Sequence, residues 1–363
     1  MAAVAFYISG HGYGHASRQV EIINALGRRH PGVGVFVRSS AARWLLERTI
    51  KIPFDLDDRH TDTGVVQLDS LRLDARATMA AAGRFYSTLE TRALDEAKRL
   101  HDHRVDLVIA DAPPLGCAAA QQAGVPSVVV SNFTWDWIYE AYADEHPRAA
   151  ETITAIRAAY RLAAAAWRLP MHGDFIPFDA IVNVPFVARH SDKDPSSTRA
   201  HLGLPLDKRL VLPSFGGYGV QGLDLDTVDL PDGWAIARGL DQTEIYDAGL
   251  SYQDLVRAVD VVITKPGYGI VSECIANGTA LVYTSRGRFP EYDVFVREMP
   301  RYLRCAFISN EELLAGRWAA AIEAATGAPE PPERPRTDGA EVVADMIAAC
   351  LPGASSSRPP ASP

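Results

Sequence analysis

One local pattern occurs twice in the chain and restricts what it can fold into: a short β-branched run, a glycine-containing turn and then a helical run. The first copy is Val4–Ser9 followed by Gly10–Arg18, and the second is Val261–Thr264 followed by Lys265–Gly269. Glycines let the backbone approach a ligand closely, and the helix N-terminus behind each turn favours negative charge. Ligands of parallel α/β sheets bind beyond the carboxyl ends of the strands, so each copy predicts a ligand-binding edge.

The rest of the chain alternates strands and helices in the same way, as parallel sheets covered on both faces do. The chain has 363 residues, and because domains usually hold roughly 100–200 residues, two domains are expected. We predict an α/β protein with two Rossmann-like domains facing a central cleft. The other expected strands are 34–38, 107–110, 127–131, 210–214, 234–238 and 280–284, and the expected helices are 18–28, 87–99, 115–123, 151–168, 252–258, 270–276 and 340–350.

Interruptions of this pattern predict the domain boundaries. Pro, Gly and Asp recur over residues 169–187, which indicates an extended connection. The first domain is therefore expected over residues 1–190 and the second over 198–328. A helix over 336–352 follows a proline-rich run, with packing back on the first domain as one option. The low-complexity segment 353–363 predicts a disordered tail.

Composition excludes several classes of protein. The net charge of −9 provides no large basic face, which argues against nucleic acid as a partner. The four cysteines, Cys117, Cys274, Cys305 and Cys350, form no C-x-x-C pair, so free thiols in a reducing cytoplasm are expected. No apolar run reaches the ~20 residues of a membrane helix, and no basic leader begins the chain. We expect a cytoplasmic protein without an integral membrane segment, and the oligomeric state stays open.

The first glycine loop carries two histidines. It lacks the Gly-Lys-Ser/Thr of a phosphate-binding loop of the Walker type, and His15 stands where a dinucleotide fingerprint needs its third glycine. Imidazole has an ordinary pKa of about 6.5, which suits a general base near neutrality. We predict His15 or His11 as the base, Gly12 and Gly14 as contacts of the nucleotide sugar, and Asp111 at the end of a neighbouring strand as a weaker catalytic candidate. The alternative is a solvated or capping histidine.

The second glycine loop predicts a diphosphate site. Backbone N–H groups at the helix start can bind phosphate, and Glu273, one turn in, can accept from two vicinal ribose hydroxyls. A first-turn glutamate also simply suits the helix dipole, and surface charge is an equally good account of either Arg286 or Glu291. The predicted nucleotide-sugar contacts of this half are Phe215, Gly216, Gly217, Lys265, Gly267, Tyr268, Gly269, Ser272, Glu273, Arg286 and Glu291.

A third cluster follows the strand 127–131. Aromatic residues alternate there with polar ones, a composition that suits a sugar because its C–H faces stack and its hydroxyls need polar partners. The predicted acceptor or sugar contacts are Asn132, Trp135 and Asp136, together with Arg18 from the first loop. A packed lid over the core explains the cluster equally well.

In order and spacing, these motifs resemble the glycosyltransferase-like N-terminal half of plant arabinokinases and their bacterial relatives. The matching segments are 10–18, 132–139, 215–217, 230–234 and 265–273. Gly12–Arg18 is also similar to the Gly-x-Gly-His loop of inverting glycosyltransferases and of related nucleotide-sugar hydrolases. Gly269–Glu273 is similar to the donor segment of lipid-II-forming N-acetylglucosaminyltransferases. The resemblance implies the GT-B architecture, His15 as base or positioning group, and ribose contact at Glu273; it does not imply sugar kinase activity, because the kinase half is not in the sequence.

These observations predict an inverting, metal-independent glycosyltransferase for a hexosyl, pentosyl or aminosugar group. The nucleoside diphosphate sugar would be a co-substrate held mainly by the second half, and a small acceptor with a hydroxyl or amine would bind the first half. No cofactor or metal is expected, since neither Asp57–Asp58 nor Asp224–Asp226 follows a predicted strand beside the glycine loops. The alternatives are a nucleotide-sugar hydrolase or epimerase in the same cleft, or a non-catalytic module that binds a sugar or nucleotide sugar.

Overall fold

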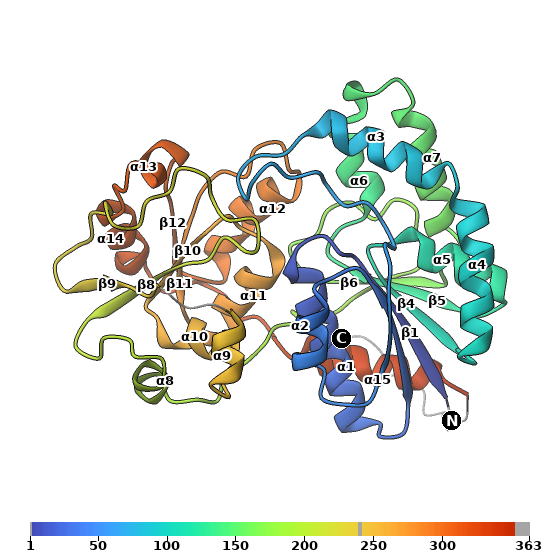
Figure 1. The fold of residues 1–363 in the computed structure, drawn as a ribbon, viewed down its shortest axis with the longest axis horizontal. Coiled ribbons are helices and arrows are strands. Elements are labelled where there is room, and N and C mark those ends of the chain that lie inside the picture. The colour runs from blue at the N-terminus through green and yellow to red at the C-terminus, as the bar shows by residue number, and fades with distance from the viewer. Residues whose placement is uncertain (1, 239–241, 353–363) are drawn as a thin grey trace.

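The computed structural model describes residues 2–238 and 242–352, so the predicted tail over 353–363 lies outside the described residues. The first half forms a seven-stranded parallel sheet in the order β3-β2-β1-β4-β5-β6-β7 (Figure 1). Successive residues of β1 point to opposite faces, so Phe6 and Ile8 pack in one core layer and Tyr7 in the other. The strands are β1 (Ala3–Ile8), β2 (Gly34–Ser39), β3 (Asp55–Asp58), β4 (Leu107–Asp111), β5 (Ser127–Ser131), β6 (Ala165–Arg168) and β7 (Ile181–Asn183).

Helices cover both faces of this sheet, as the alternation predicts (Figure 1). They are α1 (Tyr13–Arg29), α2 (Arg43–Thr49), α3 (Ala75–Tyr86), α4 (Leu89–Asp102), α5 (Pro114–Ala123), α6 (Trp135–Glu140), the short 3₁₀ helix η1 (Ala143–Glu145) and α7 (Ala149–Tyr160).

The second half repeats the arrangement with a five-stranded parallel sheet in the order β12-β11-β10-β8-β9. The predicted α/β class with two Rossmann-like halves is therefore confirmed. The strands are β8 (Arg209–Pro213), β9 (Trp234–Ile236), β10 (Val261–Thr264), β11 (Ala280–Tyr283) and β12 (Cys305–Phe307). The helices are α8 (Pro195–His201), α9 (Gln242–Asp247), α10 (Tyr252–Ala258), α11 (Tyr268–Asn277), α12 (Glu291–Glu298), η2 (Met299–Arg301), α13 (Asn310–Leu314), α14 (Ala319–Gly327) and α15 (Gly339–Cys350).

Both glycine-loop helices begin earlier than predicted. The first was expected from Arg18, but α1 begins at Tyr13, immediately after Gly12, whose φ of 71° lies in the left-handed region that glycine adopts without strain. The second was expected from Ile270, but α11 begins at Tyr268. His15 and Arg18 therefore lie on the first two turns of a helix and not on a loop.

Two further predictions were wrong. The helix expected over 151–168 ends at Tyr160, and Ala165–Arg168 forms β6, because hydrogen bonding beside β5 outweighs the local alanine preference for helix. Asp57 and Asp58 were not expected in a strand, but they end the edge strand β3. There Asp57 pairs with Arg38 at 3.2 Å and with Arg99 at 2.7 Å.

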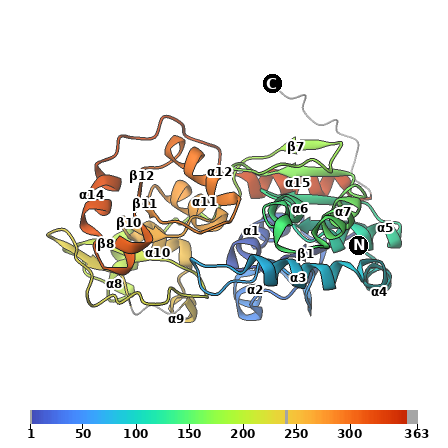
Figure 2. The same ribbon diagram turned by 90° about the horizontal axis from the view of Figure 1, so that it is seen from above.

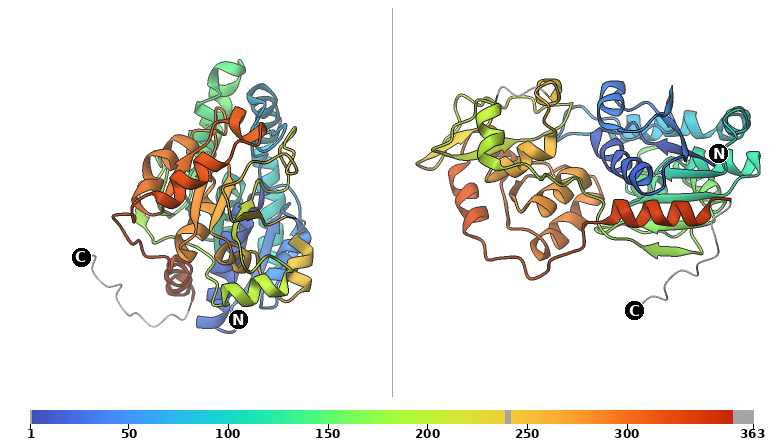
Figure 3. Two further views of the ribbon diagram at one scale, coloured as in Figure 1. Left: turned by 90° about the vertical axis from the view of Figure 1, so that its left-hand side faces the viewer. Right: turned by 90° about the horizontal axis from the view of Figure 1, so that it is seen from below.

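The last helix, α15, crosses back to the first half and packs along α1 (Figure 3, right). Val343 and Ile347 are buried in the same cluster as Ile22 of α1. Exposed ion pairs line the seam, with Arg29 at 2.6 Å and His30 at 2.8 Å from Asp345. None of the described helices has the length and apolar character needed to cross a membrane. All four cysteines are free thiols.

A segment of the first half enters the core of the second. This strap, residues 59–74 between β3 and α3, reaches across to the second half (Figure 2). Ser70 N–H donates to the Gly219 carbonyl at 3.0 Å, and Ser70 Oγ donates to the Phe215 carbonyl at 2.5 Å. Leu71, 6% exposed, joins the hydrophobic cluster of the second sheet. The strap therefore holds the glycine turn 214–219 from the opposite half.

We predict that Leu71→Ala lowers the free energy of unfolding by about 2–4 kcal/mol, because a buried leucine lost to alanine leaves a cavity. Leu68→Ala is the matched control, since Leu68 lies on the same strap but is 57% exposed, and exposed substitutions cost within about 0.5 kcal/mol. Urea unfolding midpoints of both variants measure the effect. Equal midpoints would show that Leu71 adds nothing to the stability of the second core and that the strap only rests on its surface.

Candidate active site

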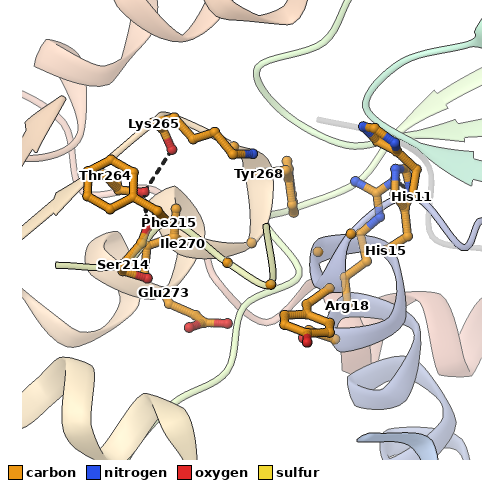
Figure 4. Close-up of a pocket in the computed structure, with 18 of the residues that line it drawn as sticks. His11, His15, Arg18, Ser214, Phe215, Thr264, Lys265, Tyr268, Ile270 and Glu273 are labelled. Carbon is orange, nitrogen blue, oxygen red and sulfur yellow. Dashed lines mark hydrogen bonds between the residues drawn. The ribbon is translucent and has the colours of Figure 1, made fainter. Parts of the chain in front are cut away.

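A cleft lies between the carboxyl ends of the two sheets, within about 1050 Å³ of empty space that is partly open to solvent. The first turns of α1 and α11 meet there, so closely that a Cβ placed on Gly269 would lie 3.3 Å from Cα of Gly14. Figure 4 shows His11, from the turn before α1, and His15 and Arg18 of α1 facing Lys265 and Tyr268 of the second half. Helix N-termini carry unpaired N–H groups and a partial positive charge. Two of them in one cleft predispose it to anion binding.

His15 is held by a buried carboxylate. Its Nδ1 lies 2.9 Å from Asp111 Oδ1, and the two residues are 6% and 0% exposed. Arg18 donates from Nε to Asp111 Oδ2 at 2.6 Å and from Nη2 to Oδ1, and Gln19 Nε2 adds a hydrogen bond to Oδ2 at 3.1 Å. Burial alone would raise the pKa of Asp111, but the charge of Arg18 and the hydrogen bonds to the carboxylate lower it to about 2. Asp111 is therefore an anion that can only accept hydrogen bonds.

The backbone after Asp111 is strained at Ala112, and hydrogen bonds from neighbouring residues hold it in place. Ala112 follows with φ of 69°, in a region that costs a non-glycine residue roughly 1–2 kcal/mol. Its carbonyl accepts a hydrogen bond from Tyr160 Oη at 2.5 Å, and the Trp135 N–H donates to the same Oη at 3.1 Å. Strain of this kind persists only where its surroundings hold it. Here the support keeps the carboxylate of Asp111 under His15.

A hydrogen-bonded chain joins the His15 site to the second half. Arg18 Nη1 donates to Asn132 Oδ1 at 2.6 Å, and Asn132 Nδ2 donates to Glu291 Oε1 at 2.7 Å. Arg286 Nη1 then donates to Glu291 Oε2 at 3.0 Å. The Arg18 guanidinium also stands 5.1 Å from the centroid of the Tyr268 ring. The contacts between the two halves are therefore polar, buried and directional at this point.

His11 has a different environment from His15. Its ring stacks on Phe289 with 6.1 Å between centroids and meets Trp135 edge-on at 5.7 Å. The Val65 N–H donates to its Nδ1 at 3.4 Å, which leaves the proton on Nε2. Burial, and then the positive charge of Arg286, holds the pKa of His11 well below its ordinary value. Near neutrality His11 is an uncharged hydrogen-bond donor.

The second half contributes the groups suited to a diphosphate. The N-terminus of α11 opens into the cleft at Gly267, and the side chain of Lys265 extends toward α1 (Figure 4). Burial, and then the charge of Arg286, holds the pKa of Lys265 well below its ordinary value. The glycine turn after β8 contributes Phe215, Gly216 and Gly217 to the lining of the cleft. An anion entering the cleft would relieve the repulsion between these cations.

Glu273 is paired with a residue of the linker between the two sheets. Arg189 donates to Glu273 Oε1 from Nε at 2.8 Å and from Nη2 at 2.5 Å. Both side chains are buried and both line the cleft. Burial raises the pKa of Glu273, and the Arg189 charge offsets part of the rise.

Most of the predicted site residues line this cleft. In the first half these are His11, Gly12, Gly14, His15 and Arg18; in the second half they are Phe215, Gly216, Gly217, Lys265, Gly267, Tyr268, Gly269, Glu273, Arg286 and Glu291. The two loops that the sequence places about 250 residues apart thus form one site.

Five predicted residues lie behind the lining and not in it. Asp111 and Asn132 are fully buried and act through Arg18 and His15. Ser272 turns its hydroxyl back to the Gly269 carbonyl at 2.9 Å, as serine within a helix often does. Trp135 is fully buried and donates from Nε1 to Asp62 Oδ2 at 2.7 Å.

Asp136 is the fifth of these residues. It accepts a hydrogen bond from Arg157 Nε of α7 at 2.9 Å and is 1% exposed. Because α6 turns successive residues by about 100°, the side chain after Trp135 points away from the cleft. The prediction that Asp136 contacts a sugar is not supported by this position, and the aromatic cluster is largely the packed lid that was its alternative.

Three residues important to the site were not predicted. Arg189 lies in the linker, Asp62 lies on the strap, and Phe289 carries the stacked His11 ring and lies 3.7 Å from the Arg286 guanidinium carbon. None of them belongs to a glycine motif or a strand end, which are the signals that local sequence offers. Within the described ranges, no three His, Cys, Asp or Glu side chains gather in a way that could hold a metal ion.

Comparison with known proteins gives both a sequence relative and a fold. No protein-family model matches the chain. It is 31% identical over 357 residues to L-arabinokinase of Arabidopsis thaliana, an alignment that covers 94% of this chain and 34% of that protein. The predicted resemblance to arabinokinases is thereby confirmed, and the chain spans about a third of that relative's length.

Solved structures match nearly the whole chain. The glycotransferase of kitacinnamycin superposes with a TM-score of 0.64 at 17% identity, covering 96% of this chain and 99% of that one. Phytolacca americana UGT2, complexed with UDP-2fluoro-glucose and pterostilbene, gives 0.56 at 12% identity, covering 96% and 94%. The chain has the GT-B fold.

We predict that His11 makes stability depend on pH. The pKa of His11 is lower in the folded protein than in the unfolded chain, where it is about 6.5. Below that pH the unfolded chain binds a proton at His11 and the folded protein does not, so the free energy of unfolding falls as the pH falls. The wild type should therefore lose up to about 2 kcal/mol more than His11→Asn between pH 7.5 and pH 5, as measured by urea unfolding. His101→Asn, at an exposed histidine, is the control and should follow the wild type. Parallel losses in all three proteins would contradict the prediction.

Proposed function

We propose that the chain is an inverting, metal-independent glycosyltransferase that moves a sugar from a nucleoside diphosphate to a hydroxyl or amine of a small acceptor. The observation that carries this proposal is the hydrogen bond of 2.9 Å between His15 and Asp111, located where two helix N-termini face one cleft. A base beside an anion-binding site is the arrangement that such a transfer needs.

The tautomer of His15 follows from its partner. Asp111 is ionised and cannot donate, so His15 Nδ1 carries the proton and Nε2 is left with its lone pair. Nη2 of Arg18 also lies near Nδ1, but its two protons are used by Asp111 and by Ser131 Oγ at 3.0 Å. His15 thereby has the orientation of a general base, whereas His11 is a donor with a lowered pKa. We assign the base to His15.

The reaction follows as one displacement at the anomeric carbon. His15 Nε2 takes the proton of the acceptor hydroxyl, whose oxygen forms the new bond to that carbon. The bond from the carbon to the diphosphate oxygen breaks, and the nucleoside diphosphate leaves with the electron pair. The imidazolium that forms is stabilised by Asp111. The α11 N-terminus and Lys265 are placed to stabilise the charge on the departing diphosphate.

A solved structure with the same fold supports the proposed partners through the ligands that it contains. One solved neighbour is complexed with UDP-2fluoro-glucose and pterostilbene, a pairing of nucleotide sugar and small molecule. We propose the same two kinds of partner here, with the donor against α11 and the acceptor against α1. The kinase activity named for L-arabinokinase is not proposed, because the chain spans only about a third of that protein.

The first test is ligand binding. We predict that one nucleoside diphosphate, or its sugar, raises the melting temperature, because a ligand at 100 times its Kd stabilises the native state by about 2.7 kcal/mol. A panel of uracil, thymine, guanine and adenine nucleoside diphosphates and their sugars, measured by thermal shift and calorimetry, would identify the donor. If the whole panel leaves the melting temperature unchanged, the transferase proposal fails.

The second test concerns His15. With the donor identified, His15→Gln should lower the turnover number by about 10²–10⁴ and leave the donor Kd within a few fold, since loss of a general base costs about that much. His30→Gln is the matched control, because His30 also pairs with an aspartate, Asp345 at 2.8 Å, but on the surface. If the chain is instead a non-catalytic binding module, the wild type and both variants should form no product. Release of free sugar without an acceptor would indicate the hydrolase.

A further inference from the structure

Arg189 lies where the linker and both halves of the molecule meet. The linker, residues 184–194, runs from β7 to α8, and Arg189 is 8% exposed within it. Its side chain donates twice to Glu273 Oε1 of α11, and Nη1 reaches Tyr246 Oη of α9 at 3.3 Å. Its backbone carbonyl accepts from Asn277 Nδ2 at 3.0 Å. Hydrogen bonds therefore hold Arg189 at both its guanidinium group and its backbone carbonyl.

Both hydrogen bonds from Arg189 go to one carboxylate oxygen of Glu273, Oε1, and neither goes to the other, Oε2. Each carboxylate oxygen has two lone pairs, and the two Arg189 N–H groups occupy both of those on Oε1. Among the described residues nothing donates a hydrogen bond to Oε2, and Oε2 is not among the polar atoms sealed from solvent. Glu273 lines the cleft. It therefore presents one oxygen, with two free lone pairs, to whatever occupies the cleft.

The charge around Arg189 keeps Glu273 available as an anion. The charge of Arg189 also acts on Glu21 of α1, as the charges of Arg28, Glu273 and Glu341 do more weakly. Burial raises the pKa of Glu21 and of Glu273, and for both Arg189 is the largest opposing influence. A buried carboxylate without such a cation tends to take up a proton, and it would then donate a hydrogen bond instead of accepting two.

We propose that Arg189 is a positioning residue for nucleotide recognition: by occupying Oε1 of Glu273, it holds the carboxylate so that Oε2 can make the ribose contact expected of Glu273. The inference rests on the proposed function, because it concerns the nucleotide of that same donor. It makes the donor a ribonucleotide sugar, as opposed to a deoxyribonucleotide sugar. It also places the determinant of this specificity in the linker, outside both glycine motifs.

The experiment measures a ratio of affinities. The Kd values of the uracil, thymine, guanine and adenine ribonucleoside diphosphates and of their 2′,3′-dideoxy analogues are determined by calorimetry on the full chain. The wild type should bind the ribose form of its preferred base about 10- to 100-fold more tightly than the dideoxy form, as hydrogen bonds to a charged group usually contribute. In Arg189→Gln and in Glu273→Gln that ratio should approach unity. The double variant should show the same ratio as either single variant, because the two residues act as one unit.

Two further variants separate positioning from stability. Arg189→Lys keeps the charge but loses the two-pronged geometry, so its ratio should be intermediate, and it serves if Arg189→Gln does not fold. Arg199→Gln is the matched control: Arg199 pairs with Asp260 at 2.9 Å in the same half and does not line the cleft. It should lower the melting temperature and leave the ratio unchanged.

The outcomes are distinct. A ratio in Arg189→Gln and Arg189→Lys equal to that of the wild type, or an equal loss of affinity for both forms, would overturn the inference and make Arg189 purely structural. A wild type that binds a nucleoside diphosphate without preferring ribose would overturn it as well, with the proposed function intact. If no nucleoside diphosphate binds the wild type, the proposed function fails first and the inference with it.

Discussion

The buried ion pair between Arg18 and Asp111 is the interaction on which the rest of the site depends. Asp111 has no exposed surface and Arg18 only 3%. An ionised carboxylate at that depth costs several kcal/mol unless it is paired and hydrogen-bonded. Arg18 supplies the pairing, and His15 and Gln19 add further hydrogen bonds. The same carboxylate that anchors α1 to β4 also orients His15, so folding and the proposed catalysis use one group.

The second constraint is the contact between the two helix N-termini. Gly14 and Gly269 allow α1 and α11 to approach within a distance that a side chain on Gly269 would crowd. Two partial positive charges so close together repel each other in the absence of a ligand. Lys265 and Arg286 add to that positive charge, and burial, followed by the charge of Arg286, lowers the pKa of Lys265. A diphosphate is the kind of ligand that would convert this repulsion into attraction.

Three connections set how the halves lie against each other. The strap inserts Leu71 into the second core, the linker places Arg189 against Glu273, and α15 returns to pack along α1. Each of them also contacts an element that forms the cleft: the glycine turn, the helix α11 and the helix α1. The geometry of the site is therefore sensitive to residues that lie far from it in the chain.

The sequence by itself determined the two strand, glycine turn and helix units, the α/β class and most of the residues that line the cleft, because β-branched runs, glycines and apolar spacing act over a few neighbouring residues. It could not determine which carboxylate supports His15, since Asp111 is 96 residues away, nor that Arg189 pairs with Glu273 across 84 residues. It also assigned Asp136 to a sugar, whereas the turn of α6 directs that side chain to Arg157. Only the tertiary structure decided these points, because burial and pairing between distant segments leave no periodic trace in the chain.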